Sequence, residues 1–428
     1  MHRRSTLPFF LALLLTLASA CRPSAPDSKF VSDWLRLTRS VAGNARVSPP
    51  VAARVAAYSS IALYEAYAAD GRSRLQSLAG QLNGLWKVPS VGEQPVDGAT
   101  VAAEAQRVVL DSLFGGELGA RRAIDSLAAA QTEARRRDGV RVSTRDRSLM
   151  HGRELAKTLL AWAANDGFST TRGRPWRATR TTGRWAPPDT GAMEPRWGAL
   201  RTFALRSGDE CAPPAPPAYS EVAGSPFWKM GRELYDSARA PNAEQDAIAR
   251  FWAESPNATG APGFHWISIL DQVVMLRKVS ADQAAEAYML TSVSMADAFI
   301  GSWREKYRSM VARPATYVNR VFDRGWKSLV PPPPSPEYPS DHAVLSGAAA
   351  QVLVRLLGDS TPFTDSTQLD AGVPVRSFRG ISHARDEAAI SGAFGGIHYM
   401  PAIVNGASQG TCIGERVLGR LRTRLGSA

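Results

Sequence analysis

Apolar residues recur every three to four positions over most of the chain, the spacing that places them on one face of an α-helix. In the first part of the chain this pattern predicts helices at residues 28–38, 49–67, 100–113, 121–136 and 146–165. In the second part it predicts helices at residues 226–238, 243–252, 265–277, 282–308 and 343–353. Strand-like alternation is confined to short pieces, so the pattern predicts an all-α protein.

Two stretches, residues 168–205 and 211–219, lack a helical period and are rich in proline. The first also contains Trp176, Trp185 and Trp197, a composition that favours an ordered loop over a flexible linker. The predicted helices never separate into two self-contained sets. Residues 21–428 are therefore predicted to form a single helical-bundle domain with long loops.

The first 20 residues have the pattern of an export signal. Two early arginines give a positive start, residues 7–18 form an apolar core, and residues 18–20 are small, as at a cleavage site. The apolar run is too short to span a bilayer. Cys21 follows directly, so the segment resembles a bacterial lipoprotein signal with Cys21 as the lipidated first mature residue. An ordinary secretory leader cleaved before Cys21 is the alternative. Either way, we expect an exported protein, anchored in the bacterial envelope or periplasmic or secreted.

The charge distribution indicates which ligands to expect, and the cysteine content indicates whether a disulfide is possible. The net charge is +12, and the basic residues are spread along the 428-residue chain rather than clustered. This distribution favours a small anionic substrate or an anionic surface over dedicated nucleic-acid binding. Cys211 and Cys412 remain after the leader, and they could pair in an oxidising compartment.

The candidate chemistry lies between Lys306 and His398. A proline-rich run at residues 331–336 delivers the chain in an extended form to Ser340, where the helix predicted at residues 343–353 begins. Ser340 therefore occupies an N-cap position, followed by backbone N–H groups without helical partners. Such a helix start is an anion-binding site.

Two cations and two histidines accompany Ser340. Lys306 and Arg313 are seven positions apart, so on one continuous helix ended by Pro314 they would share a face. His342 is a candidate general acid or base near neutral pH. His398, after two glycines that allow close backbone approach, is a candidate nucleophile toward phosphorus or apical ligand of a metal oxyanion. Taken singly, Lys306 and Arg313 are better explained as solvated surface cations, and each histidine can be explained as a hydrogen-bonded core residue. Together they could hold a phosphate-like oxyanion.

The order and spacing of this set resemble the three-part signature of the vanadium-dependent haloperoxidases, shared with the type 2 phosphatidic acid phosphatase superfamily. The three parts are Lys306-x6-Arg313-Pro314, Pro339-Ser340-x-His342, and Ser391 seven residues before His398. The resemblance covers most of the mature chain, with the signature region at residues 295–428. Flanking matches lie at residues 185–198, 251–253, 262–266 and 396–414.

The resemblance implies an all-α bundle of the haloperoxidase and acid phosphatase type. In that family vanadate or phosphate is held by a lysine, two arginines, a serine and a glycine amide. By this resemblance Lys306, Arg313 and Ser340 would be oxyanion ligands and His342 the acid or base. His398 would bind the vanadium of a vanadate cofactor or become phosphorylated. The implied activity is peroxide-dependent halide oxidation, or phosphomonoester hydrolysis through a phosphohistidine.

Two positions depart from the family pattern. Asp341 replaces the glycine between the serine and the histidine, and Gly392 replaces the second arginine. An aspartate suits a helix start and could substitute for the bound anion. The missing arginine removes a charge-assisted hydrogen bond of about 1.5–3 kcal/mol, or one to two decades of affinity. We therefore expect weak vanadate binding. Arg385, seven residues before Gly392, could share its helix face but is interpreted as a surface residue, and Arg379 and His383 are less well placed.

Three functions stay open at this point. The intact ligand set favours an enzyme, either a haloperoxidase or a phosphatase, and this is the leading expectation. Asp341 and Gly392 favour a non-catalytic exported scaffold or binding protein with a degenerate oxyanion site. A divalent cation held by Asp341, His342 and His398 is also permitted by the ligand types, although no metal-ligand spacing supports it.

Overall fold

The computed structural model describes residues 26–178, 181–189, 191–253 and 262–426, and the export signal and Cys21 lie outside these ranges. The first helices are α1 (Lys29–Asn44), α2 (Pro49–Ala68), α3 (Gly98–Phe114), α4 (Leu118–Arg137), α5 (Val142–Ala163) and α6 (Phe168–Thr171). They are followed by α7 (Pro226–Ala238), α8 (Ala243–Trp252), α9 (His265–Arg277), α10 (Ala281–Ser309), α11 (Pro314–Val321), α12 (Asp341–Leu357), α13 (Ile381–Phe394) and α14 (Met400–Arg420). The short 3-10 helices are η1 (Trp197–Ala199), η2 (Pro262–Phe264) and η3 (Leu369–Ala371).

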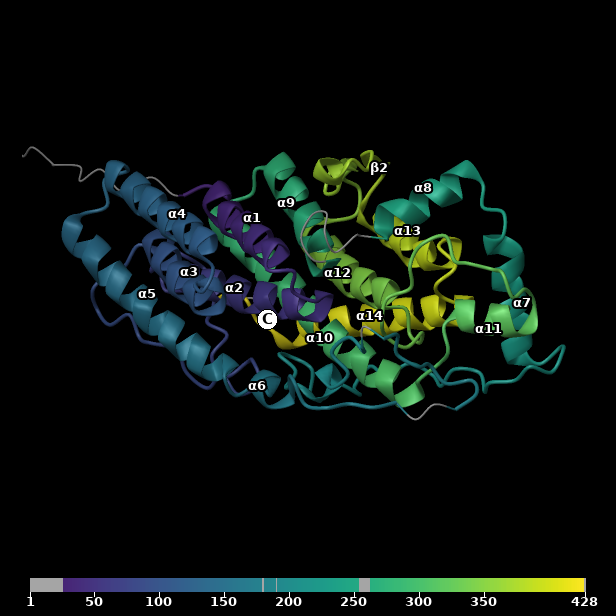
Figure 1. Ribbon diagram of the computed structural model, residues 1–428. Helices are drawn as coiled ribbons and strands as arrows, with labels where there is room; N and C mark the ends of the chain where they lie inside the picture. The colour runs from purple at the N-terminus through teal and green to yellow at the C-terminus, as the bar shows by residue number, and fades with distance from the viewer. Residues whose placement is uncertain (1–25, 179–180, 190, 254–261, 427–428) are drawn as a thin grey trace, which may run out of the picture.

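The described regular structure is helical apart from strands β1 (Phe363–Asp365) and β2 (Arg376–Phe378), which pair in antiparallel register. The prediction of an all-α helical bundle is therefore confirmed. In Figure 1, α2 to α5 gather at one end of the molecule and α7, α8, α11 and α13 at the other. α10, α12 and α14 lie between these two groups. No helix among the described residues combines the length and the apolar character that crossing a bilayer requires.

α10 is the central helix, and it packs against α2, α12 and α14. Nearly all of its residues from Ala281 to Lys306 are buried, as expected for a helix enclosed on all sides. Its start is fixed by a capping box, in which Ser280 and Gln283 each accept the other's backbone N–H. The end of this rigid helix carries Lys306, so the lysine reaches the interior on a well-anchored element.

Glycines allow α12 and α14 to approach closely. A Cβ added at Gly410 would lie 2.1 Å from the carbonyl oxygen of Val344, and one at Gly347 would lie 2.8 Å from that of Ala407. Only glycine permits this separation of the two backbones. A hydrogen bond also connects the first turns of α12 and α14, because the N–H of Ser340 donates to the carbonyl of Ala402 at 3.0 Å.

The chain between Lys306 and Arg313 differs from the prediction of one continuous helix ended by Pro314, which is wrong. α10 ends at Ser309, and Met310 takes a left-handed conformation with φ of 53°. Arg313 is the N-cap of α11, and Pro314 is the first residue of that helix, where its missing N–H costs nothing. α11 and the glycine-rich α14 were not predicted from periodicity.

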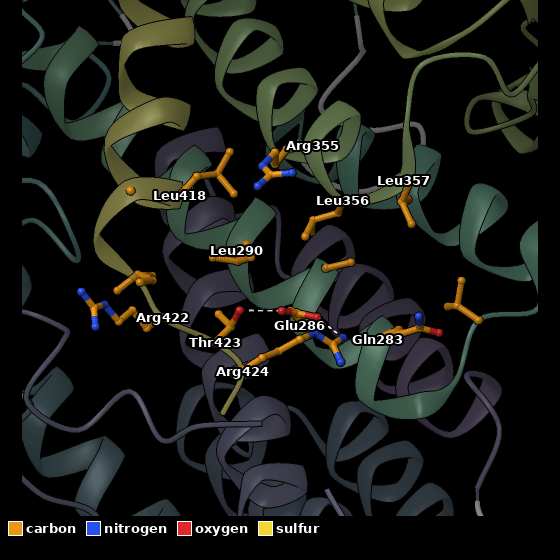
Figure 2. Close-up of a pocket in the computed structure, with 14 residues that line it drawn as sticks. Gln283, Glu286, Leu290, Arg355, Leu356, Leu357, Leu418, Arg422, Thr423 and Arg424 are labelled. Atoms are coloured by element: carbon orange, nitrogen blue, oxygen red, sulfur yellow. Dashed lines mark hydrogen bonds and ion pairs between the residues drawn. The ribbon is translucent and has the colours of Figure 1, made fainter. Parts of the chain in front are cut away.

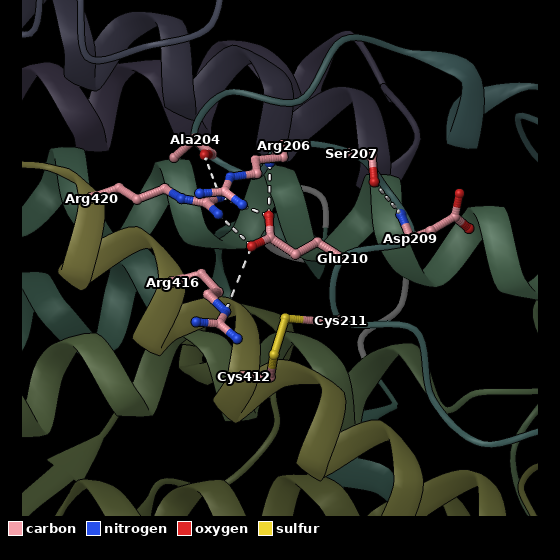
Figure 3. Close-up of a disulfide and its surroundings, with 9 residues drawn as sticks. All are labelled: Ala204, Arg206, Ser207, Asp209, Glu210, Cys211, Cys412, Arg416 and Arg420. Atoms are coloured by element: carbon pink, nitrogen blue, oxygen red, sulfur yellow. Dashed lines mark hydrogen bonds and ion pairs between the residues drawn. A yellow bond between two sulfur atoms is a disulfide. The ribbon is translucent and has the colours of Figure 1, made fainter.

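Cys211 and Cys412 form a disulfide that joins the loop before α7 to α14, with their Cα atoms 5.9 Å apart (Figure 3). The pairing that the sequence allowed is therefore observed. Next to it, Arg420 donates to Glu210 at 2.7 Å, and Arg416 lies 3.6 Å from the same carboxylate. The bond and the ion pairs fasten the same loop to α14.

Removing this disulfide is expected to lower the free energy of unfolding by about 2–5 kcal/mol, because the crosslink restricts a long loop in the unfolded chain. The cysteines are 201 positions apart. Urea denaturation of Cys211→Ser/Cys412→Ser against the oxidised wild type measures the loss. Reduced wild type serves as the control and should match the double variant. Equal midpoints for the oxidised and reduced proteins would contradict the expectation.

Candidate oxyanion site

Four of the predicted site residues, from four segments, meet in the interior of the described structure. Lys306 lies on the last turn of α10, Arg313 caps α11, Ser340 caps α12, and His398 lies between α13 and α14. Each of these residues is at most 3% exposed. The fold thus brings the predicted oxyanion ligands together and shields them from solvent.

The turn that carries His398 is fixed by the end of α13. Gly396 has φ of 73°, a left-handed conformation that glycine adopts without strain. The N–H groups of Ile397 and His398 both donate to the carbonyl of Gly392, at 2.9 and 3.1 Å. The helix terminus therefore positions the backbone of His398.

The imidazole of His398 lies between a carboxylate and a guanidinium. Its Nδ1 is 3.1 Å from Oε1 of Glu337, and its Nε2 is 3.1 Å from Nη1 of Arg313. A guanidinium can only donate, so Nε2 accepts and Nδ1 carries the proton. Burial, followed by the charge of Arg313, lowers the pKa of His398. The contacts describe a neutral imidazole whose orientation is set by Glu337.

The carboxylate of Asp341 lies beside the lysine and the imidazole that were expected to hold the anion. Its Oδ1 is 3.0 Å from Nζ of Lys306 and 3.7 Å from Nε2 of His398. Burial by itself would raise the pKa of Asp341, but the adjacent Lys306 ammonium acts in the opposite direction, and the pKa lies well below its ordinary value. Burial lowers the pKa of Lys306 to about 8, although Asp341 opposes that shift. Asp341 therefore acts as an internal anion.

The donors of Lys306 are all directed at protein oxygens. In addition to Asp341, Nζ contacts the carbonyls of Pro336 and Glu337, at 3.0 and 3.3 Å. An ammonium has three N–H groups. The two carbonyls accept hydrogen bonds from the ammonium, whereas Oδ1 of Asp341 is its ion-pair partner and accepts no hydrogen bond from a described residue.

Arg313 is similarly engaged. Its Nε donates to the carbonyl of Ser335 at 2.9 Å, and Nη2 donates to the hydroxyl of Ser335 at 3.0 Å. Nη1 donates to the carbonyl of Ile397 at 3.1 Å and faces His398. Four of the five N–H groups of the guanidinium are used in this way. The residue is therefore not free to clamp an oxyanion through two parallel hydrogen bonds.

A side chain at Gly392, where the family has an arginine, would press against His398. A Cβ added there would lie 3.0 Å from Cδ2 and 3.2 Å from Cβ of His398. The imidazole ring packs on the face of α13 from which an arginine side chain at this position would leave. The missing arginine is thus accompanied by close packing of His398, which would have to shift to admit a side chain.

The residues present do not fit a bound vanadate in this arrangement. Asp341 places a negative charge against the lysine, and the donors of Lys306 and Arg313 are directed at protein groups. The hydroxyl of Ser340 accepts the N–H of Ala343 as a helix cap at 3.4 Å. The cluster is an internal ion-pair network, in which Oδ1 of Asp341 pairs with Lys306 and accepts no hydrogen bond from a described residue.

The remaining predicted residues lie at the edge of this cluster. His342 follows Asp341 in the first turn of α12 and is half-buried, close enough for its charge to influence the Asp341 pKa. Arg385 pairs with Asp386 at 2.7 Å, so it does not replace the missing arginine. In the part of the chain that the structure describes, no three His, Cys, Asp or Glu side chains are placed to hold a metal ion. The divalent-cation hypothesis is therefore wrong for these residues.

Glu337 and Ser335 complete the site but were not predicted. Glu337 is 1% exposed and accepts the N–H of Tyr399 at 2.9 Å in addition to facing His398. Ser335 is fully buried against Arg313. The available signal was their position in the proline-rich segment just before Ser340. Hydrophobic periodicity gives no information about an acidic residue in an extended segment, so the sequence did not indicate whether Glu337 would be buried or exposed.

The fold and this cluster define an all-α protein with an oxyanion-type site. A family model described as the VCPO second helical-bundle domain matches residues 322–426. The solved structure of the first bacterial vanadium-dependent iodoperoxidase is similar with 34% identity and a TM-score of 0.86, covering 94% of this chain and 98% of that chain. The chain belongs to the vanadium-dependent haloperoxidase superfamily.

More distant structures share the fold. The holo form of a bacterial vanadium-dependent chloroperoxidase has 16% identity and a TM-score of 0.63, covering 87% of this chain and 92% of that one. The apo form has 16% identity and a TM-score of 0.64, covering 87% and 94%. At this identity the likeness concerns the fold alone. The search of curated proteins found no match.

Proposed function

We propose that this protein is a haloperoxidase-like member of the superfamily whose oxyanion site is closed by its own Asp341, and that it acts as a non-catalytic exported binding protein or scaffold. The observation that carries this proposal is the 3.0 Å contact between Oδ1 of Asp341 and Nζ of Lys306. An internal carboxylate held at this position competes with any external oxyanion, because it is always present beside the lysine. The fold is kept, and the charged groups of this cluster pair with one another instead of with a ligand.

The charge balance of the cluster supports this proposal. Lys306 and Arg313 face two carboxylates, Asp341 and Glu337, and the hydrogen bonds of His398 describe a neutral ring. No net positive charge remains to attract a further anion. Breaking the Lys306–Asp341 pair to admit one would leave a buried carboxylate without its partner, a change that costs several kcal/mol.

Export and anchoring are proposals that rest on the leader. The positive start, the short apolar core and the small residues before Cys21 support export and lipidation at Cys21. An anchored scaffold or binding protein in the envelope is consistent with a disulfide between Cys211 and Cys412, because such bonds persist in oxidising compartments.

A second candidate is peroxide-dependent halide oxidation with vanadate, or phosphomonoester hydrolysis at His398. The observation that favours it is the convergence of Lys306, Arg313, Ser340 and His398, with the unprotonated Nε2 of His398 turned toward Arg313 and Asp341. The resemblance to the bacterial iodoperoxidase supports it as well. For either reaction the Asp341 carboxylate would first have to leave the cluster or accept a proton.

One set of measurements separates the two candidates. Calorimetric titration with orthovanadate and with phosphate is expected to show no sub-millimolar binding. Two activities are measured: iodide oxidation with peroxide and vanadate, and hydrolysis of p-nitrophenyl phosphate. The rate of each is expected to equal the rate of the His398→Ala control. Sub-millimolar binding together with turnover that His398→Ala abolishes would overturn the proposal and establish the second candidate.

A further inference from the structure

A second cavity lies at the far end of the helices that build the oxyanion site. Its walls come from the first half of α10, the last turns of α12 and α14, and the segment after α14 (Figure 2). Its volume is about 580 Å³, within the range of small-molecule pockets. Arg355, on its wall, is 14 positions after Asp341 on α12, which is about 21 Å along the helix axis. The cavity is therefore separate from the cluster around Asp341.

The apolar part of the cavity is formed by aliphatic side chains from three helices and the segment that follows them. Ala287 and Leu290 of α10, 1% and 2% exposed, are among its lining residues. The other apolar lining residues are Val279, Leu356, Leu357, Leu418 and Leu421. A surface of this composition favours binding of an alkyl chain, because contact with aliphatic side chains removes the chain from water.

The polar part of the cavity has unbalanced positive charge. Its acidic lining residue, Glu286, accepts the hydroxyl of Thr423 at 2.5 Å and pairs with Arg424. The guanidinium groups of Arg355 and Arg422 form no hydrogen bond or ion pair with any described residue. In Figure 2 the side chain of Arg355 lies between Leu418 and Leu356, next to the apolar walls.

We propose that this cavity binds an anionic amphiphile of the fatty-acid class. The carboxylate is held by Arg355, with Arg422 adding positive charge at the rim, and the alkyl chain lies on the leucines. A guanidinium presents two parallel N–H groups that match the two oxygens of a carboxylate. The neighbouring aliphatic walls supply the affinity that a single surface charge pair lacks. This ligand site does not depend on the state of Asp341.

Calorimetric titration of the full mature protein with laurate tests the proposal, with dodecanol and dodecyltrimethylammonium as probes of equal chain length. Laurate is expected to bind in the micromolar range. Dodecanol and dodecyltrimethylammonium are expected to bind at least about tenfold more weakly. Arg355→Gln is expected to weaken laurate binding about tenfold or more. Arg385→Gln removes the same charge from α13, away from the cavity, and should bind as the wild type does.

Three results would overturn the proposal: no binding of laurate, equal binding of the three amphiphiles, or wild-type affinity in Arg355→Gln. Inorganic phosphate distinguishes an anion site from an amphiphile site, and competition of phosphate with laurate at equal concentration would also count against it. Asp341→Gly should bind laurate as the wild type does, whatever it does with vanadate. The two proposals for this protein can therefore fail separately.

Discussion

Replacing Asp341 with glycine is expected to raise the affinity for orthovanadate and phosphate on the order of 100-fold. The substitution removes a carboxylate 3.0 Å from Lys306 and 3.7 Å from His398. Unit charges about 4 Å apart interact by roughly 4 kcal/mol near a protein surface, so loss of the internal anion both frees the lysine and removes a repulsive charge. Titration calorimetry on the wild type and the variant measures the change.

Two further variants separate charge from space at this position. Asp341→Asn keeps the volume and removes the charge, so its affinity should fall between those of the wild type and Asp341→Gly. Gly392→Arg alone should bind no better than the wild type, because Asp341 still supplies the counter-charge and the new side chain would press against the imidazole of His398. If Asp341→Gly binds as weakly as the wild type, the internal anion is not what closes the site.

Replacing Lys306 with methionine is expected to lower the free energy of unfolding by about 3–5 kcal/mol. The lysine is fully buried, and its loss leaves Asp341 without its ion-pair partner and two carbonyls without a donor. The double variant Lys306→Met/Asp341→Asn should recover most of this loss, since no uncompensated charge remains. Urea denaturation of the two single variants and the double variant forms a complete cycle.

An exposed pair provides the control. Lys157 and Glu154 are 2.8 Å apart with side chains 68% and 60% exposed, so Lys157→Met should change stability by no more than about 0.5 kcal/mol.

The pH dependence of the free energy of unfolding in acid gives a second check of the buried pair. Because the pKa of Asp341 is held well below its ordinary value of 3.8, its contribution is complete above that pH and is lost as the pH falls through the lowered value. The stability difference between wild type and Asp341→Asn should therefore shrink in acid. A Lys306→Met variant as stable as the wild type would contradict the buried pair.

The helices were largely predictable because each depends on local spacing. The positions at residues 226–238, 243–252 and 265–277 coincide with α7, α8 and α9. Where sequence separation alone was used, it misled: Lys306 and Arg313 are seven positions apart but belong to different helices, since Met310 ends the first with a left-handed residue. α14 was not predicted, because its glycines lower helical propensity while serving close contact with α12.

The sequence by itself determined the all-α fold, the membership in the haloperoxidase superfamily and four of the residues that meet at the site, Lys306, Arg313, Ser340 and His398. It also showed that Asp341 and Gly392 depart from the family. Only the tertiary structure decided what these departures do. Asp341 pairs with Lys306, Glu337 fixes His398, and the donors of Arg313 end on Ser335 and Ile397. The physical reason is that residue type fixes which hydrogen bonds and charges a side chain offers, whereas its partners depend on distances between segments far apart in the chain.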